Sequence, residues 1–206
     1  MLKKFVLGGM TALVLAACGG EGGSASSSVP AQTASASGSL IERINNKGTI
    51  TVGTEGTYAP FTYHDKDGKL TGYDVEVTRA VADKLGVKVE FKETQWDSMM
   101  AGLKAGRFDV VANQVGLTSP ERQATFDKSE PYSWSGAVLV ARKDSNIKSI
   151  DDIKGVKTAQ SLTSNYGEKA KAAGAELVPV DGLAQSLTLI EQKRADATLN
   201  DELAVL

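Results

Sequence analysis

Helical and extended patterns alternate along the chain from Leu40 onward, and this alternation restricts the fold more than any other feature of the sequence. Short apolar runs such as TITVG (49–53) and VKVEFKE (87–93) predict strands, and a segment with apolar residues at helical spacing (73–85) lies between them. Strands that alternate with helices form sheets whose faces the helices cover. The sequence therefore predicts the α/β class.

A shift of 87 residues aligns two copies of the pattern Arg-x-Asp-x-x-x-Asn. The copies consist of Arg107, Asp109 and Asn113 and of Arg194, Asp196 and Asn200. Each copy has the same strand and helix order around it, so we interpret the chain as two similar lobes, 40–133 and 134–206, joined at EPYSWSG (130–136). Open α/β sheets bind ligands beyond the carboxyl ends of their strands, which predicts a site in the cleft between the lobes.

The first 39 residues differ in character from the rest. Two lysines precede an apolar stretch that ends at residue 17, and Cys18, the only cysteine, follows. This is the pattern of a secretory signal peptide, and it is too short to span a membrane comfortably. The ending LAAC resembles the bacterial lipobox, whose cysteine is acylated. We predict a signal peptide at 1–17, lipid attachment at Cys18 and a flexible tether at 18–39. An ordinary signal peptide with an incidental cysteine is the alternative.

Composition excludes several classes of function. The formal net charge is −2, and no basic stripe or aromatic ladder is present, so we expect no nucleic-acid partner. Apart from Cys18 the chain has no cysteine, and it has one histidine, His64. Disulfides, thiol catalysis and Cys/His metal sites are therefore excluded from the mature domain. His64 lies in a turn-like stretch and is expected at the surface. We expect a monomer that uses no metal or other cofactor.

The stretch NQVGLTSPER (113–122) places a single arginine at the start of a predicted helix. Ser119 is the expected N-cap and Pro120 suits the first position, so Arg122 falls in the first turn. A cation there opposes the helix dipole, which favours anions at that end. If an anion binds, however, backbone N–H groups and the guanidinium together form a carboxylate site. The alternative is a surface arginine paired with Glu121 or Asp127.

The equivalent strand end in the second half offers the opposite charge. ATLNDE contains Asp201, which suits an ammonium group, and a helix start capped by Ser164 is expected to face the same cleft. A cation on one lobe and an anion on the other match a zwitterionic α-amino acid. Glu55 and Tyr58 follow the first strand, and Trp96 begins a helix, so their side chains are candidates to surround the ligand. Packing at the edge of the core is the alternative for Tyr58 and Trp96.

Four stretches resemble bacterial periplasmic solute-binding proteins of family 3, which serve polar-amino-acid ABC transporters: GTEGTYAPF, GYDVEV, FDVVANQVGLTSPER and NDE. The resemblance covers nearly all of residues 40–206. It implies a two-lobed, periplasmic-binding-protein-like type II fold, the venus flytrap, which closes on one amino acid and presents it to a membrane permease. Cystine-binding members are the most similar. An acid at position 55 suits the distal ammonium of cystine, and arginine, lysine or histidine would also satisfy it.

The resemblance also assigns site residues by position. Arg122 would bind the α-carboxylate and Asp201 the α-ammonium, while Tyr58 and Trp96 would flank the ligand's side chain and Glu55 would meet its far end. The complete predicted ligand-binding set is Glu55, Tyr58, Trp96, Asn113, Gln114, Gly116, Thr118, Arg122, Thr163, Ser164, Asn165 and Asp201. The run from 116 to 120 is one residue longer than in many relatives. No catalytic residue is expected.

The same resemblance predicts where the protein is located in the cell and whether its second lobe is complete. It implies a protein of the periplasm or cell envelope that the lipid anchors to a bacterial membrane. Relatives continue for several tens of residues past the position of Leu206, so we expect an incomplete second lobe that lacks the return to the first. Two other functions stay open: a periplasmic dehydratase-like enzyme, with Glu55 and Asp201 as its paired carboxylates, and a surface adhesin or signalling lipoprotein.

Overall fold

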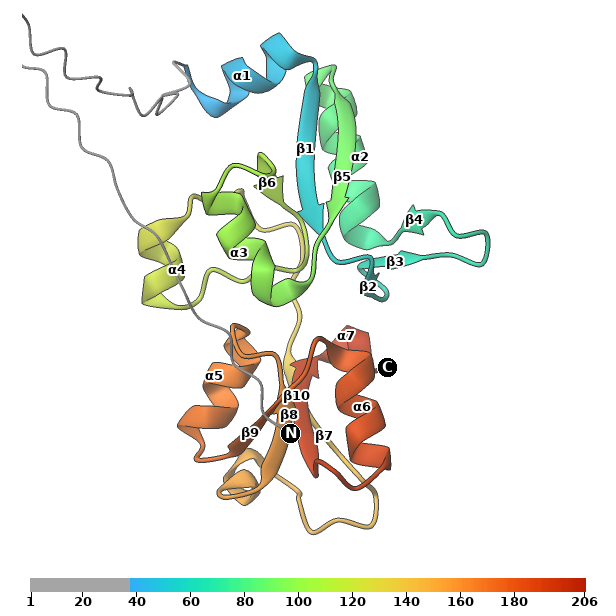
Figure 1. The fold of residues 1–206 in the computed structure, drawn as a ribbon, viewed down its shortest axis with the longest axis vertical. Helices are drawn as coiled ribbons and strands as arrows, with labels where there is room; N and C mark the ends of the chain where they lie inside the picture. The colour runs from blue at the N-terminus through green and yellow to red at the C-terminus, as the bar shows by residue number, and fades with distance from the viewer. Residues whose placement is uncertain (1–37) are drawn as a thin grey trace, which may run out of the picture. The chain divides into compact units, whose positions relative to one another are not determined.

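The computed structural model describes residues 38–206, and two separate α/β sheets organise them (Figure 1). The predicted signal peptide, Cys18 and the tether up to residue 37 lie outside the described residues. We call the elements around the sheet β5-β1-β6 lobe 1 and those around the sheet β7-β10-β8-β9 lobe 2. The exact boundary between lobes that the sequence suggests, at residue 133, stays a prediction.

Lobe 1 is built on a parallel sheet with β1 at its centre. β1 pairs in parallel with β5 over its whole length and with β6 over two residues. A small antiparallel sheet, β2-β3-β4, follows β1 along the chain. The elements are α1 (Leu40–Lys47), β1 (Thr49–Thr54), β2 (Thr57–Tyr58), β3 (Thr62–His64), β4 (Leu70–Thr71), α2 (Tyr73–Leu85), β5 (Lys88–Glu93), α3 (Trp96–Lys104), β6 (Val110–Val111) and α4 (Pro120–Thr125).

The core of lobe 1 packs α1 and α2 against the central strand. Ile50 and Val52 of β1 form a buried cluster with Ile44 of α1 and Ala82 of α2. Elsewhere in the lobe, α3 lies close to the sheet because Gly53 of β1 and Gly102 of α3 have no side chains and leave room for the ring of Phe108. A Cβ atom on Gly53 would lie 2.7 Å from the ring of buried Phe108, and one on Gly102 of α3 would meet the same ring.

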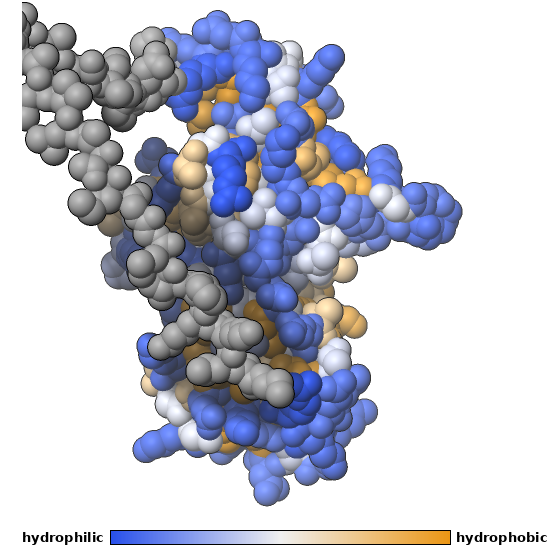
Figure 2. Space-filling view, viewed as in Figure 1, coloured by the Kyte–Doolittle hydropathy of each residue, from blue (hydrophilic) through white to orange (hydrophobic). Residues whose placement is uncertain are grey.

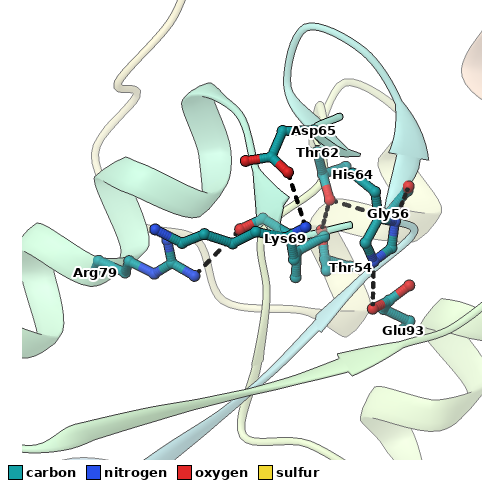
Figure 3. A network of polar contacts seen from close by, with 9 residues as sticks. Thr54, Gly56, Thr62, His64, Asp65, Lys69, Arg79 and Glu93 are labelled. Carbon is teal, nitrogen blue, oxygen red and sulfur yellow. Dashed lines mark hydrogen bonds and ion pairs between the residues drawn. The ribbon is translucent and has the colours of Figure 1, made fainter. Parts of the chain in front are cut away.

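Polar contacts fix the segment between β1 and β2 (Figure 3). The Thr54 hydroxyl donates to Thr62 Oγ1 at 2.7 Å, and Gly56 N–H donates to the same oxygen at 3.1 Å. The two ring nitrogens of His64 contact Gly56 O at 3.1 Å and Glu93 Oε1 at 3.2 Å. Because these bonds hold both ends of the segment, the carboxyl end of β1 has a defined conformation. His64 is exposed, as the sequence predicted.

Lobe 2 is a mixed sheet with helices on both faces. β8 pairs in parallel with β9 and β10, and β7 runs antiparallel to β10. The elements are β7 (Ala137–Ala141), a 3₁₀ helix (Ile150–Ile153), β8 (Lys157–Gln160), α5 (Asn165–Ala172), β9 (Glu176–Pro179), α6 (Leu183–Glu191), β10 (Ala197–Asp201) and α7 (Glu202–Val205). Side chains of α6 pack with Ala159 of β8 in one cluster, and Ala170 of α5 packs with Leu199 of β10 in another.

The 87-residue repeat has a counterpart in the backbone. Arg107 N–H donates to Gly102 O, and Arg194 N–H donates to Leu189 O, both at 2.9 Å. Each bond joins the start of a repeat copy to the helix that precedes it, and Gly102 and Leu189 are themselves 87 positions apart. The repeat therefore corresponds to a shared local structure.

Contacts outside their own element shape two segments of lobe 1. The helix α3 begins at Trp96, as the sequence predicted, and Gln95 is its N-cap, while the Asp97 carboxylate bonds to lobe 2. In the stretch FDVVAN only Val110–Val111 forms a strand. At its start, the Asp109 carboxylate accepts the Thr51 N–H at 2.8 Å, which removes that donor from strand pairing.

The visible surface is mostly polar. On the face shown in Figure 2, hydrophilic residues dominate and hydrophobic ones form small patches. Trp134, between α4 and β7, is an exception at 81% exposed. Among residues 38–206, no helix has both the length and the apolar character that crossing a membrane requires.

Candidate ligand-binding site

A pocket lies where the carboxyl ends of strands from both sheets meet. Lobe 1 contributes Glu55 after β1 and Asn113 after β6, and lobe 2 contributes Gln160 at the end of β8 and Asn200 in β10. This is the position at which open α/β sheets bind ligands. The pocket has a volume of about 60 Å³, and it adjoins a larger, more open hollow of about 650 Å³ that shares Glu55 in its lining.

The predicted site residues fall into two groups. Those that line the pocket are Glu55, Tyr58, Trp96, Asn113 and Gln114 from lobe 1 and Ser164 and Asn165 from lobe 2. Those that do not are Gly116, Thr118, Arg122, Thr163 and Asp201. The two charged residues at the centre of the amino-acid prediction are thus buried beside the pocket wall rather than in it, at 7% exposed for Arg122 and 4% for Asp201.

Arg122 lies in the first turn of α4, as the sequence predicted. Its N–H donates to the N-cap Ser119 Oγ at 3.3 Å. Its guanidinium donates to Gly116 O at 3.0 Å and, across the lobes, to Thr163 O at 2.7 Å. The same group lies 5.5 Å from the centre of the Trp96 ring, whose side chain lines the pocket. One guanidinium therefore connects the loop before α4, lobe 2 and the pocket wall.

No carboxylate neutralises Arg122 within the described residues. The ion pairs among residues 38–206 do not include it, so the alternative pairing with Glu121 or Asp127 is not formed. Burial lowers the pKa of Arg122, and the charges of Glu168 and Glu121 partly oppose this. A buried cation without a counter-charge is costly unless an anion arrives.

Asp201 ends β10 and caps α7. Its Oδ1 accepts the Ser135 hydroxyl at 2.7 Å and the Leu203 N–H at 2.9 Å. Burial raises the pKa of the neighbouring Tyr166 to about 12, and the Asp201 charge adds to that rise. Tyr166 and Asn200, the residue before Asp201, line the pocket, so the Asp201 charge lies close to it without being part of the lining.

Glu55 and Asn113 bond to each other at the ends of β1 and β6. Asn113 Nδ2 donates to Glu55 Oε2 at 2.7 Å, and Glu55 N–H donates to Asn113 Oδ1 at 2.8 Å. Burial raises the pKa of Glu55 from 4.5, the Asn113 bond lowers it, and the Asp97 charge raises it further. A partly desolvated carboxyl of this kind is stabilised in its ionised form by a nearby cation.

Tyr58 and Asn200 connect the lobes directly. The Tyr58 hydroxyl donates to Asn200 Oδ1 at 2.6 Å, and its ring packs 5.4 Å from that of buried Phe61. Tyr58 thus both lines the pocket and packs at the edge of the core. Asn200 was missed as a site residue, although the repeat pointed to it as the equivalent of Asn113. Gln160 and Tyr166 also line the pocket, and no motif marked them.

Residues 50–204 match the family of bacterial extracellular solute-binding proteins, family 3. The chain belongs to this family. Its description as extracellular places this solute-binding protein outside the cytoplasm.

Two curated relatives narrow the comparison within the solute-binding family. A probable amino-acid ABC transporter-binding protein of Haemophilus influenzae is 62% identical over 84% of this chain and 68% of the relative. The L-cystine-binding protein TcyA of Bacillus subtilis is 61% identical over 82% of this chain and 63% of the relative. The chain therefore spans about two thirds of the length of the curated relatives it matches.

A solved structure supports the fold of this solute-binding protein. An ancestral arginine-binding protein bound to arginine is 36% identical, with a TM-score of 0.72 over 77% of this chain and 72% of that one. The two-lobed type II periplasmic-binding-protein fold expected from the sequence is thereby confirmed.

Gln114 ties the pocket of the solute-binding protein to the segment that joins its lobes. It adopts a positive φ of 51°, and both its N–H and its side-chain amide donate to Asp74, at 2.6 and 2.7 Å. The Ser133 hydroxyl donates to Gln114 Oε1 at 2.8 Å. Asp74 is fully buried, which raises its pKa, while the Gln114 bonds lower it. The strained backbone is therefore held by a buried carboxylate.

Proposed function

We propose that the protein binds one polar amino acid between its lobes and delivers it to an ABC transporter permease, with cystine as the favoured ligand. The observation that carries this proposal is the pocket itself, which residues at strand ends of both lobes line together. A ligand that contacts both lobes at once favours the closed arrangement over the open one. The family and the binding functions named for the relatives support the proposal.

Charge is the basis for proposing an amino acid. Arg122 is a buried cation of lobe 1 without a carboxylate partner in the described residues, and Asp201 is a buried anion of lobe 2. Each acts on a lining residue: the Arg122 guanidinium lies 5.5 Å from the centre of the Trp96 ring, and the charge of Asp201 raises the pKa of Tyr166. In the proposed complex the α-carboxylate interacts with Arg122 and the α-ammonium with Asp201. Small side-chain shifts on binding are required for both contacts.

Glu55 and the shape of the cavity favour a ligand with a second charged end. Glu55 lines both the pocket and the adjoining open hollow, so a ligand long enough to occupy both would contact it. Cystine carries a distal ammonium, and the B. subtilis relative is named an L-cystine-binding protein. Arginine, lysine and histidine are the competing ligands.

The proposal includes the membrane. We infer that the signal peptide directs export, that Cys18 carries a lipid anchor and that residues 18–39 form the tether to the binding lobes. A monomer anchored in this way would meet the permease at the surface of the membrane.

The proposed role is binding without catalysis, in line with the names of the relatives. General acid–base chemistry needs a poised group in the pocket. Of the two carboxylates that the dehydratase-like alternative would pair, Glu55 lines the pocket and Asp201 does not, and His64 is not a lining residue either. No cluster of metal-ligating side chains occurs among residues 38–206.

A thermal-shift screen tests this function. The twenty amino acids, cystine, ornithine and citrulline are each added to the protein, and hits are confirmed by calorimetric titration. A ligand at 100 times its Kd stabilises the folded state by about 2.7 kcal/mol, so a binding amino acid raises the Tm measurably. We expect cystine to give the largest shift with one site per chain. If every compound leaves the Tm unchanged, amino-acid binding is excluded and the adhesin or signalling alternative gains support.

A further inference from the structure

His64 of β3 contacts an acceptor with each of its two ring nitrogens (Figure 3). Nδ1 lies 3.1 Å from Gly56 O, and Nε2 lies 3.2 Å from Glu93 Oε1 at the end of β5. A neutral imidazole has one N–H donor and one acceptor nitrogen, whereas the protonated ring has two donors. Only the protonated ring can therefore donate to both partners at once.

Gly56 allows the three groups to lie close together. Its φ is 74°, and a Cβ atom on it would lie 2.5 Å from Glu93 Oε2 and 3.1 Å from His64 Cε1. The backbone here is fixed, because Gly56 N–H donates to Thr62 Oγ1 at 3.1 Å and Thr94 N–H donates to the last residue of β1 at 2.8 Å. The side chain of Glu93 is 46% exposed, so it is the partner that is free to move.

Glu93 is the only charged side chain bonded to the ring of His64 among residues 38–206. Other charged side chains on the elements around the ring bond elsewhere or are exposed: Asp65, Lys66, Asp67 and Lys69 on the β3–β4 hairpin, Glu76 and Arg79 on α2, Glu90 and Lys92 on β5, and Glu55 after β1. Protonation of His64 is therefore coupled first to Glu93.

Loss of the proton releases Glu93 and not Gly56. Histidine is the side chain whose charge changes between about pH 5 and pH 8. The neutral ring keeps one donor, and its other nitrogen then turns a lone pair toward an acceptor. The Gly56 carbonyl cannot turn away, whereas the Glu93 carboxylate can rotate into solvent. We therefore expect the neutral ring to carry its proton on Nδ1.

The released carboxylate has a place where its charge matters. Glu93 lines the open hollow beside the pocket, and Glu55 and Asp181 line the same hollow. While Glu93 is bound to the imidazolium, a positive charge compensates its own. Once it is free, the hollow gains an uncompensated negative charge, which attracts a cation more strongly.

We propose that His64 is a proton switch that compensates the charge of Glu93 when protonated and releases it when neutral. His64 acts through Glu93 and is a positioning residue. The switch makes the hollow more attractive to the cationic end of a ligand as the pH rises. This effect on affinity rests on the proposed function, whereas the proton-dependent contact between His64 and Glu93 does not.

Nuclear magnetic resonance of the full chain tests the contact without ligand. His64 is the sole histidine, so one set of ring signals reports on it. The ring nitrogen shifts and the Glu93 carboxyl signal are followed from about pH 5 to pH 8. We expect the Nδ1–H tautomer at the upper end and a Glu93 signal that moves in step with the ring. In His64→Gln the Glu93 signal should stay still over this range.

Glu90→Gln is the matched control, because Glu90 is an exposed acid of the same strand that bonds to Lys92 and not to His64. Its ring signals should equal those of the parent. A neutral ring with its proton on Nε2, or a Glu93 signal that ignores the ring, would overturn the switch.

Calorimetric titration with cystine, which carries a distal ammonium, tests the effect on the hollow. Between about pH 5 and pH 7.5 the affinity of the parent should rise about two- to fivefold more than that of His64→Gln, the factor for a partly exposed ion pair. Glu93→Gln should behave like His64→Gln, and Glu90→Gln like the parent. Equal rises in all four chains would overturn this effect. If the parent binds no cystine, the proposed ligand fails while the resonance signals alone decide the switch.

Discussion

Asn113 and Asn200 occupy the same position in the two repeat copies, yet they do different things. Asn113 bonds only within lobe 1, where it aligns Glu55 through two hydrogen bonds. Asn200 accepts the Tyr58 hydroxyl from the other lobe. A repeated residue at the end of a strand thus organises one lobe internally and connects the other lobe to its partner. Shared local structure therefore does not imply a shared role.

The buried charged side chains of the two lobes also differ in the hydrogen-bond partners that hold them. Arg122 is held by main-chain carbonyls of both lobes, so its position depends on how the lobes meet. Asp201 is held by Ser135 on the joining segment and by Leu203 on α7, so its contacts do not involve lobe 1. The anion is thus fixed within one lobe, whereas the cation is held by both.

The largest effect on this difference between the lobes is expected when the charge of Arg122 is removed. Arg122→Ala should weaken amino-acid binding by about 2–5 kcal/mol, the loss expected when one partner of a buried charge pair is truncated. Calorimetric titration measures it, with Arg107→Ala, an exposed arginine of the same lobe, as the control. A loss smaller than tenfold would contradict a carboxylate-binding role.

The fixed anion should respond less strongly. Asp201→Asn keeps an oxygen that accepts from Ser135 and Leu203, so the Tm should change little while the charge is lost. We expect binding to weaken by about 1.5–3 kcal/mol, the value of a hydrogen bond to a charged group. Asp196→Asn, at an acidic position of the repeat outside the pocket, serves as the control and should leave the affinity unchanged. Equal affinities for Asp201→Asn and the parent would remove the ammonium from this site.

The smallest effect concerns Glu55 and pH. Burial raises the pKa of Glu55 above 4.5, so the free protein takes up a proton there at a higher pH than an exposed glutamate would. A ligand with a distal ammonium stabilises the ionised form, and its affinity should therefore fall as the pH drops through this raised pKa.

Glu55→Gln should lose this pH dependence and cost roughly 1 kcal/mol for such ligands at neutral pH, with almost no cost for ligands that lack a distal charge. Titrations across the acidic range measure both quantities. A uniform loss for all ligands would argue against a role in selectivity.

Sequence reasoning was most successful where a residue acts on its own neighbourhood. The caps Ser119 and Ser164, the helix over 73–85 and the strand at 49–53 follow from local rules, and the structure has all of them. The first turn of α3 is less readable from local rules. An acidic side chain there normally bonds to its own helix end, whereas Asp97 bonds to Thr163, 66 positions away along the chain.

The candidate site shows the same limit. Strand ends are readable from sequence, and they supplied the lining residues Glu55, Tyr58 and Asn113. How deep a side chain lies is not readable, because depth depends on how two lobes pack. Arg122 and Asp201 were therefore expected in the pocket lining, whereas both are buried and neither is part of it.

The outer strand of lobe 1 has a consequence for solubility. β5 lies at the edge of its sheet, and Lys88, Glu90 and Lys92 on it are exposed. An unpaired edge invites a strand of another molecule, and charged side chains there are a common defence against such aggregation. The charged face of β5 therefore protects this edge of lobe 1 against pairing with a second copy of the chain.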